Sequence, residues 1–197
     1  ERARHDPLTG LLNRHGLEGI MQDLPENRPL SLGCFDLDGL KPVNDRSGHA
    51  AGDRLLCEVA ERMKDAMPDG QVLARVGGDE FFAILEDHGP DQTNVAIDEV
   101  IARVANSPYA ADGTSLVQIG VSAGFACYPE DSMSIAELHI LADRALYAAK
   151  DAGKGFGTRY TPAIAACSER RQRLAGNDAF RATSSAYLAL EQTRLSG

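Results

Sequence analysis

The sequence predicts an α/β (α+β) fold in which helices pack on a mixed β-sheet. Apolar runs of strand length alternate along the chain with segments of helical periodicity, a pattern typical of this fold class. The chain has 197 residues, of which 43% are hydrophobic and 25% charged, so it can bury one full core. The sequence contains no internal repeat.

Four elements are expected in the first half of the chain. Turn-forming residues at 6–10 precede a helix, for which Asn13 is the expected N-cap. Residues 29–38 form an apolar run of strand length that ends in acidic residues. Residues 48–67 have helical spacing, and residues 71–86 contain two β-rich runs around the glycine pair of a β-hairpin.

The second half continues the alternation. Residues 92–107 predict a helix and residues 115–128 a long strand. A helix rich in small residues follows at 134–153, where Gly153 is expected to end it. A short strand near Arg159 completes the set.

We expect residues 1–160 to form one domain and residues 161–197 a helical linker or packing arm outside the chemistry. The second segment has a helical pattern and a basic ERRQR cluster, which is typical of a solvated helix face. The chain begins in a charged stretch without a methionine, which suggests a piece cut from a longer protein.

Charge and hydropathy exclude several classes of partner. Acidic side chains outnumber basic ones by 29 to 20, and this argues against a DNA or RNA polymer as a ligand. An anionic small molecule is compatible if a metal and local cations balance its charge. No apolar run approaches the roughly 20 residues of a membrane span. Since there is also no signal peptide, we expect no membrane contact and a cytoplasmic location.

The cysteines indicate the redox environment. They show no paired short spacing, and three of them sit among apolar neighbours. Buried, reduced thiols are therefore expected rather than disulfides or a zinc site. The four residues are Cys34, Cys57, Cys127 and Cys167.

Acidic residues stand at the ends of two predicted strands. Asp36 and Asp38 end the first strand, and Asp79 and Glu80 occupy the hairpin turn. If the first strand pairs with the hairpin, these carboxylates gather at one end of the sheet, which is costly unless a cation lies between them. Magnesium fits, because it binds one or two carboxylates together with substrate phosphates. The alternative is that these acids only make the strand ends soluble.

Groups suited to a nucleoside triphosphate follow the first strand, in a passage that we expect to run from a loop into a helix. Asn44 offers donors and acceptors, and Asp53 could accept the N–H groups of a guanine edge, which adenine does not present. Gly48-His49 begins a helix whose N-terminus can help to bind anions. Each signal is weak alone, since Asp53 is also an ordinary acid in a first helical turn.

Five segments in this order resemble the GGDEF family, the diguanylate cyclases. The resemblance covers about residues 6–160 and rests on DPLTGLLNR, FDLDGLKPVNDRSGHAAGD, RVGGDEF, SAGFA and ADRALYAAKDAGKG. It implies condensation of two GTP molecules into cyclic di-GMP and pyrophosphate, with Mg²⁺ or Mn²⁺, in a symmetric homodimer. It also implies a mixed sheet of about five strands, similar to the palm of nucleotidyl cyclases and polymerases.

The resemblance also implies roles for individual residues. Metal binding falls to Asp36, the carbonyl of Leu37, Asp79 and Glu80. Catalysis falls to Asp79 as proton acceptor, to Glu80, and to Lys41, which supports the phosphate in the transition state. Substrate binding falls to Asn44 and Asp53 at guanine, to Lys150 and Lys154 at the triphosphate, and to His49, Gly77 and Gly78 nearby.

Three segments depart from the family pattern. Gly39-Leu40 stands where the family often has an aromatic residue, and Lys154-Gly155 replaces an Arg-Asn pair. Lysine keeps the charge but loses the bidentate fork of arginine, which puts the triphosphate affinity in doubt. Pro68–Gln71 lacks the Arg-x-x-Asp pair of the product-inhibition site.

Two other functions are compatible with the sequence. One is a catalytically silent GTP- or cyclic di-GMP-binding module that regulates a larger signalling protein. The other is a general polymerase-like palm, which would need a basic channel for a template that the charge balance does not offer.

Overall fold

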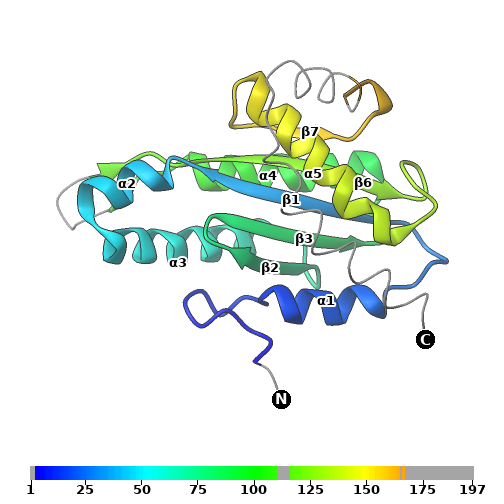
Figure 1. Ribbon diagram of the computed structural model, residues 1–197, viewed down its shortest axis with the longest axis horizontal. Coiled ribbons are helices and arrows are strands. Elements are labelled where there is room, and N and C mark those ends of the chain that lie inside the picture. Colours follow the sequence, from blue (N-terminus) through cyan, green and yellow to red (C-terminus); the bar gives the residue numbers. More distant parts are fainter. Residues whose placement is uncertain (1–2, 111–115, 165, 167–197) are drawn as a thin grey trace.

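The computed structural model describes residues 3–110, 116–164 and 166. Its main sheet has five strands in the order β2-β3-β1-β6-β7 (Figure 1). The neighbouring strands are antiparallel except β6 and β7, which run parallel, so the sheet is mixed and the predicted fold class is confirmed. In sheet order the strands are β2 (Val72–Gly77), β3 (Glu80–Glu86), β1 (Leu30–Asp38), β6 (Gly120–Tyr128) and β7 (Gly157–Arg159).

Helices cover both faces of the sheet. Along β1, Phe35 and Leu37 pack in the apolar cluster that contains the residues of α3 and α4, whereas Leu32 and Cys34 pack with α5. This division follows from the alternation of side chains between the two faces of a strand. The helices are α1 (Arg14–Gln22), α3 (His49–Ala66), α4 (Pro90–Ala105) and α5 (Ile135–Ala152).

The expected loop between the first strand and the next helix is a helix instead, which corrects the sequence-based prediction. Residues Leu40–Ser47 form α2, and Leu40 and Val43 anchor it in the core. Pro42 lies in the first turn of α2, where a backbone N–H has no acceptor within the helix. The lack of an N–H in proline therefore costs no helical hydrogen bond there. Gly48, with φ +78°, separates α2 from α3. The polar composition of the segment concealed this short amphipathic helix.

The predicted strand 115–128 is also corrected, because it divides into two. Leu116–Val117 form β5, which pairs with β4 (Tyr109–Ala110) in a separate two-stranded sheet. The main-sheet strand β6 begins only at Gly120. The apolar run continues across the break because Ile119 is buried in the core, so hydrophobicity alone does not mark it.

A close contact positions α5 on the sheet. A Cβ atom on Gly124 of β6 would lie 2.0 Å from the backbone nitrogen of Leu146 and 2.3 Å from the carbonyl oxygen of Ala142. Only glycine allows the helix backbone to approach the strand so closely. This contact fixes the height of α5 above β6 and thereby the place of Lys150 in its last turn.

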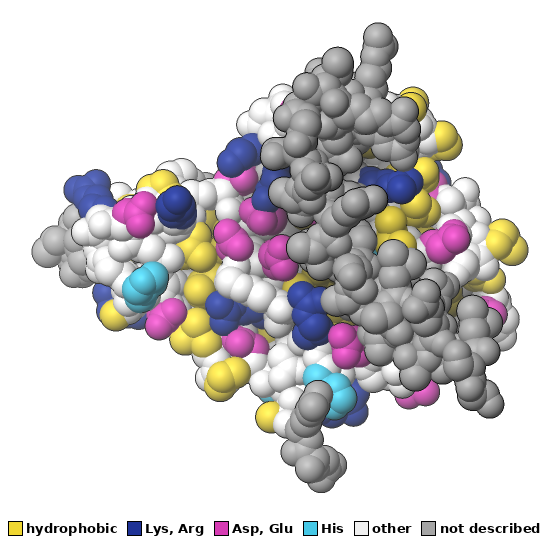
Figure 2. Space-filling view, viewed as in Figure 1, with side chains coloured by type: hydrophobic (Ala, Val, Ile, Leu, Met, Phe, Trp, Pro, Cys, Tyr) yellow, Lys and Arg dark blue, Asp and Glu magenta, His cyan; other side chains and the backbone are white. Residues whose placement is uncertain are grey.

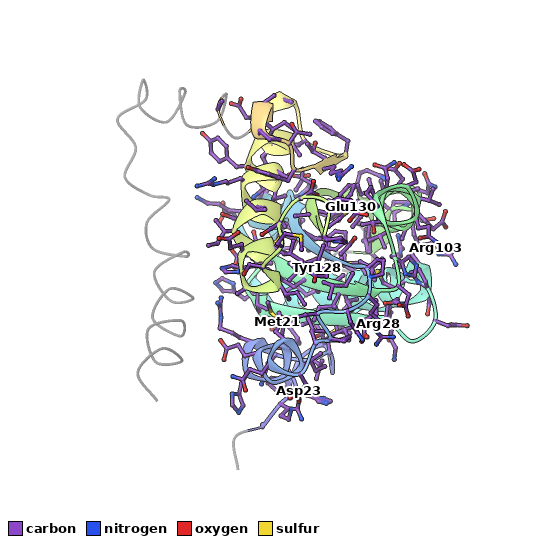
Figure 3. All side chains as sticks on the ribbon, turned by 90° about the vertical axis from the view of Figure 1, so that its right-hand side faces the viewer. Met21, Asp23, Arg28, Arg103, Tyr128 and Glu130 are labelled. Carbon is purple, nitrogen blue, oxygen red and sulfur yellow. The ribbon has the colours of Figure 1, made fainter. Side chains whose placement is uncertain are left out.

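The end of β1 that begins at Leu30 is closed by packed and paired side chains (Figure 3). The hydroxyl of Tyr128 donates to the carbonyl oxygen of Glu26, and Arg28 pairs with Glu86 and, at 3.0 Å, with Asp87. The opposite end, at Asp36 to Asp38, carries the acidic residues for which the sequence predicts a metal site.

Three cysteines lie in the part of the chain that the structure describes. Cys34 and Cys127 are buried, Cys57 is half-buried, and all three are free thiols, as predicted. Cys167 and nearly all of the predicted arm at 161–197 lie outside the described residues. Within the part of the chain that the structure describes, no helix combines the length and hydropathy needed to cross a membrane.

Candidate active site

The acids of the first strand and of the hairpin meet at one end of the sheet. β1 and β3 are antiparallel neighbours, and Asp36 stands directly opposite Glu80 in their register. The next residue, Leu37, donates its backbone N–H to the carbonyl oxygen of Asp79 over 3.1 Å. The condition on which the clustering depended, that the first strand pairs with the hairpin, is therefore met. Figure 2 shows acidic and basic side chains gathered in the middle of the face of the molecule that it views.

Lys150 balances the charge of Asp36. Its ammonium nitrogen lies 2.5 Å from Oδ2 of Asp36. Burial raises the pKa of Asp36, the contact with Lys150 opposes this, and the nearby charges of Asp79 and Asp38 raise the pKa further. Three carboxylates thus interact at this strand end, and a cation stabilises the ionised form of Asp36.

Asp143 is a further acid of this site that sequence reasoning missed. It lies on α5, two turns before Lys150. Burial raises its pKa to about 6, and the charge of Glu80 adds to the effect, whereas Lys150 and Arg144 oppose it. The only sequence signal was an acid within a helix that is otherwise rich in small and apolar residues.

The loop after α5 is tied to the end of β1 through a buried serine. Ser122 donates its hydroxyl to Oδ2 of Asp38 over 2.6 Å and accepts the backbone N–H of Gly155 over 3.0 Å. The ammonium of Lys154 lies 3.7 Å from Oδ1 of Asp38, a buried oxygen with no hydrogen-bond partner among the described residues. Lys154 itself has φ +66°, an uncommon conformation for a residue with a side chain. Asp38 and Ser122 therefore hold the loop that carries Lys154.

The hairpin turn is braced by the N-terminal segment. The guanidinium of Arg75 donates twice to the carbonyl oxygen of Gly78, over 2.9 and 3.1 Å, and pairs with Asp6 over 3.0 Å. Asp6 in turn accepts the backbone N–H and the hydroxyl of Thr9. Apart from its chain neighbours, no atom of the described residues lies within 4 Å of the position that a Cβ would take on Gly78, so the backbone there is open to a close approach. A Cβ on Gly77 would lie 3.3 Å from Glu80.

A cleft of about 490 Å³ adjoins this turn between the start of α1 and the hairpin. Its lining includes Asp6, Arg14, Arg75 and Gly78 but neither Asp36 nor Asn44. The cleft therefore does not contain the acidic strand end, and we assign the site from the acids and their partners.

The crossing of α2 and α3 carries the other predicted site residues. Asn44, on α2, is half-buried, and its Oδ1 atom is fully buried without a hydrogen-bond partner in the described part of the chain. Asp53 is exposed on α3. Lys41 is exposed in the first turn of α2, and His49 is the exposed first residue of α3. Contacts between α2 and α3 bring the segments of Asn44 and Asp53 together.

The donor set fits a hard divalent cation. Among the described residues, no group of three or more His, Cys, Asp and Glu side chains is arranged to hold a metal ion by itself. Magnesium does not require one, because it usually keeps several waters and takes one or two carboxylates with substrate phosphates. Asp36 and Asp79 interact closely enough to raise the pKa of Asp36, and the ammonium of Lys150 already stands beside that carboxylate as a positive group.

Comparison with known proteins identifies the family of this chain. Residues 3–155 match the family described as the diguanylate cyclase GGDEF domain. MucR of Pseudomonas aeruginosa, a bifunctional diguanylate cyclase/cyclic di-GMP phosphodiesterase, is 40% identical over 157 residues, which cover 77% of this chain and 23% of MucR. DgcE of Escherichia coli, a probable diguanylate cyclase, is 35% identical over 184 residues, which cover 91% of this chain and 17% of DgcE. The chain thus spans about a fifth of the length of these relatives.

Two solved structures show the same architecture. The GGDEF domain of TpbB from Pseudomonas aeruginosa has a TM-score of 0.77 and 32% identity, and the match covers 84% of this chain and 99% of that one. The GGDEF domain of DgcB from Caulobacter crescentus, in complex with c-di-GMP, has a TM-score of 0.73 and 27% identity over 81% of this chain and 96% of that one. The fold is thus that of a nucleotidyl cyclase palm. Within this class, the chain belongs to the GGDEF domain family.

Proposed function

We propose that this chain is an active diguanylate cyclase, which condenses two GTP molecules into cyclic di-GMP with release of two pyrophosphates. The observation that carries the proposal is the pairing of Asp36 with Glu80 across β1 and β3, with Asp79 in the adjacent turn. It supplies carboxylates for a metal and for proton transfer. The cytoplasmic location that the sequence predicts is part of this proposal.

Asp36, the carbonyl of Leu37, Asp79 and Glu80 would hold Mg²⁺ or Mn²⁺. The bound ion would lower the pKa of the 3′-hydroxyl and stabilise charge on the α-phosphate. Asp79 accepts the proton of the 3′-hydroxyl of one GTP, and the 3′-oxygen bonds to the α-phosphorus of the other GTP. The bond from that phosphorus to the bridging oxygen breaks, and pyrophosphate leaves with the electron pair.

Cationic side chains balance the phosphate charge. Lys150 and Lys154 bind the triphosphate, and Lys41 stabilises the negative charge that develops in the transition state. The start of α3 at His49 offers free backbone N–H groups to an anion. The open backbone at Gly78 leaves room for the phosphates beside the acids, and Gly77 adjoins it next to Glu80.

Asn44 and Asp53 select guanine. The carboxylate of Asp53 accepts two N–H groups from the Watson–Crick edge of guanine, and the amide of Asn44 adds a second polar contact. Adenine would leave the carboxylate without its donors, and an unpaired polar group of this kind opposes binding.

The reaction requires two copies of the chain. Each 3′-hydroxyl attacks the α-phosphorus of the other GTP, so one domain with one GTP provides half of the arrangement. Two domains must meet face to face about a two-fold axis. We therefore propose a transient or signal-controlled homodimer as the active form.

A silent nucleotide-binding module is the alternative. The contact between Lys150 and Asp36 favours it, because a lysine that stays on this carboxylate would compete with a metal. Lys154 in place of an arginine also weakens bidentate binding of phosphate. Such a module would bind GTP or cyclic di-GMP without turnover and regulate the longer protein.

Product formation decides between these two functions. The purified chain is incubated with GTP and Mg²⁺, and cyclic di-GMP and pyrophosphate are quantified by liquid chromatography and mass spectrometry. Formation of both in a 1:2 ratio supports the cyclase. Binding of GTP without product, also when the chain is fused to a dimerising coiled coil, supports the silent module.

A further inference from the structure

Gly52 lacks a side chain because the amide group of Asn44 fills the space. A Cβ atom on Gly52 would lie 1.9 Å from Oδ1 and 2.9 Å from Cγ of Asn44. Non-bonded heavy atoms cannot approach so closely, since attraction turns to steep repulsion well before that distance. Any larger residue at position 52 would therefore displace Asn44.

The backbone gives no other reason for a glycine here. Gly52 lies inside α3 and is absent from the glycines with positive φ. A glycine in a helix interior is less stable than an alanine, because it loses more conformational freedom on folding. The close contact with Asn44 is thus the feature of the structure that accounts for this residue.

The contact also orients the amide of Asn44. Its Oδ1 atom is fully buried and has no hydrogen-bond partner in the described residues. The oxygen instead occupies the place beside Gly52 that the Cβ atom of any other residue would take. The amide nitrogen is farther away, 3.4 Å from the same Cβ position. The oxygen therefore points into the crossing of α2 and α3, and the NH₂ group is the end turned away from it.

We propose that Gly52 is a specificity-determining positioning residue. It seats the oxygen of Asn44 so that the NH₂ group is presented to an acceptor on the base, next to the carboxylate of Asp53. Gly52 directly precedes Asp53, so one turn of α3 sets both polar contacts. The inference rests on the proposed function, since it assigns the nucleotide base to this crossing.

The test is Gly52→Ala, which adds a methyl group where the oxygen of Asn44 lies. Binding of 3′-deoxy-GTP and 3′-deoxy-ATP with Mg²⁺ is measured by calorimetry, because neither analogue has the attacking hydroxyl. We expect about tenfold weaker binding of the guanine analogue, little change for the adenine analogue, and hence a smaller preference for guanine. A merely structural defect would weaken both analogues equally.

Asn44→Ala provides the second half of a double-mutant cycle. In that background the space beside residue 52 is empty, so Gly52→Ala should change guanine binding less than about twofold. The melting temperature should be lower in Gly52→Ala and recover in the double variant, and this readout holds even if the single variant folds poorly. Gly89→Ala is the control, because a Cβ on Gly89 would meet no atom of the described residues within 4 Å, chain neighbours apart, and its φ is −81°.

The outcomes separate the inference from the proposed function. A wild-type chain with no preference for guanine contradicts the proposed function itself. If the wild type prefers guanine and Gly52→Ala keeps that preference, or if the two substitutions are additive, only the role of Gly52 is overturned.

Discussion

The ammonium group of Lys150 lies 2.5 Å from Oδ2 of Asp36, and this contact joins the last turn of α5 to the acidic end of β1. The two residues are far apart in sequence, and they meet because α5 packs directly on β6 at Gly124. The pair brings together a residue proposed to bind the triphosphate and a residue proposed to bind the metal.

Lys150→Gln should raise the Kd for GTP by about 10- to 100-fold, because a hydrogen bond to a charged group is lost. The binding of guanosine monophosphate should change much less, since it lacks the β- and γ-phosphates. Calorimetric titrations with both nucleotides measure the difference. Lys64→Gln, at an exposed position of α3, is the control. Equal weakening of the two nucleotides would speak against a triphosphate contact.

Asp36→Asn and Asp79→Asn should each abolish formation of cyclic di-GMP while the fold is retained. Each removes a metal-binding charge from a site with few other ligands. The melting temperature and the circular dichroism spectrum of each variant show whether the fold is retained. Asp65→Asn, an exposed acid of α3, serves as the control. Near-normal turnover in either variant would remove that residue from the metal site.

Asp143 should make the folded state less stable as the pH rises. Its pKa of about 6 exceeds the ordinary value of 3.8, so the folded chain binds this proton more tightly than the unfolded chain does. The free energy of unfolding therefore falls between about pH 4 and pH 6. Asp143→Asn should remove that loss and stabilise the protein by roughly 1–3 kcal/mol near pH 7, with little effect near pH 4.

Thermal unfolding across this pH range, with a chelator to exclude divalent metals, checks the prediction. The charged groups that act on Asp143 are Glu80, Lys150 and Arg144, and none of them is altered in the variant. Parallel pH curves for wild type and variant would show that Asp143 does not titrate with a raised pKa.

Specific activity should rise with protein concentration. If two half-sites must meet, dilution of the isolated chain separates them, and the rate falls more steeply than in proportion to concentration. Initial rates over a wide dilution series, with sedimentation to determine the oligomeric state, measure this. A coiled-coil fusion should remove the dependence. Constant specific activity from a proven monomer would contradict the half-site arrangement.

Product inhibition should be simple competition with GTP. The segment Pro68–Gln71 carries no arginine, and the side chain of Gln71 is engaged with the backbone of Glu86 on β3. The Arg-x-x-Asp sequence that begins at Arg62 lies farther upstream. Arg62 pairs with Glu58 and donates to the carbonyl oxygen of Ser107. Its guanidinium also lies 3.8 Å from the ring centroid of Tyr109.

Initial rates at several GTP concentrations, with added cyclic di-GMP, distinguish the two kinds of inhibition. Lines that meet at a common maximal rate are expected. Tight noncompetitive inhibition would reveal a second product site elsewhere on the chain.

The sequence by itself determined most of the elements and the main chemical groups. Alternating strand and helix patterns predicted the main-sheet segments, and Asn13 caps α1 as expected, accepting the N–H of Gly16. These features depend on neighbours within a few residues, so a local pattern is enough to reveal them. The acids at the end of β1 and at the hairpin turn were visible for the same reason.

Only the tertiary structure decided how these groups meet. Three contacts depend on the packing of separate elements. They are the pairing of Asp36 with Glu80, the hydrogen bond from Ser122 to Asp38, and the close approach of Asn44 to Gly52. α2 and the break before β6 were mispredicted because burial and strand pairing, rather than local composition, decided them. Contacts of this kind follow from the arrangement of the whole core, and a short window of sequence does not contain that information.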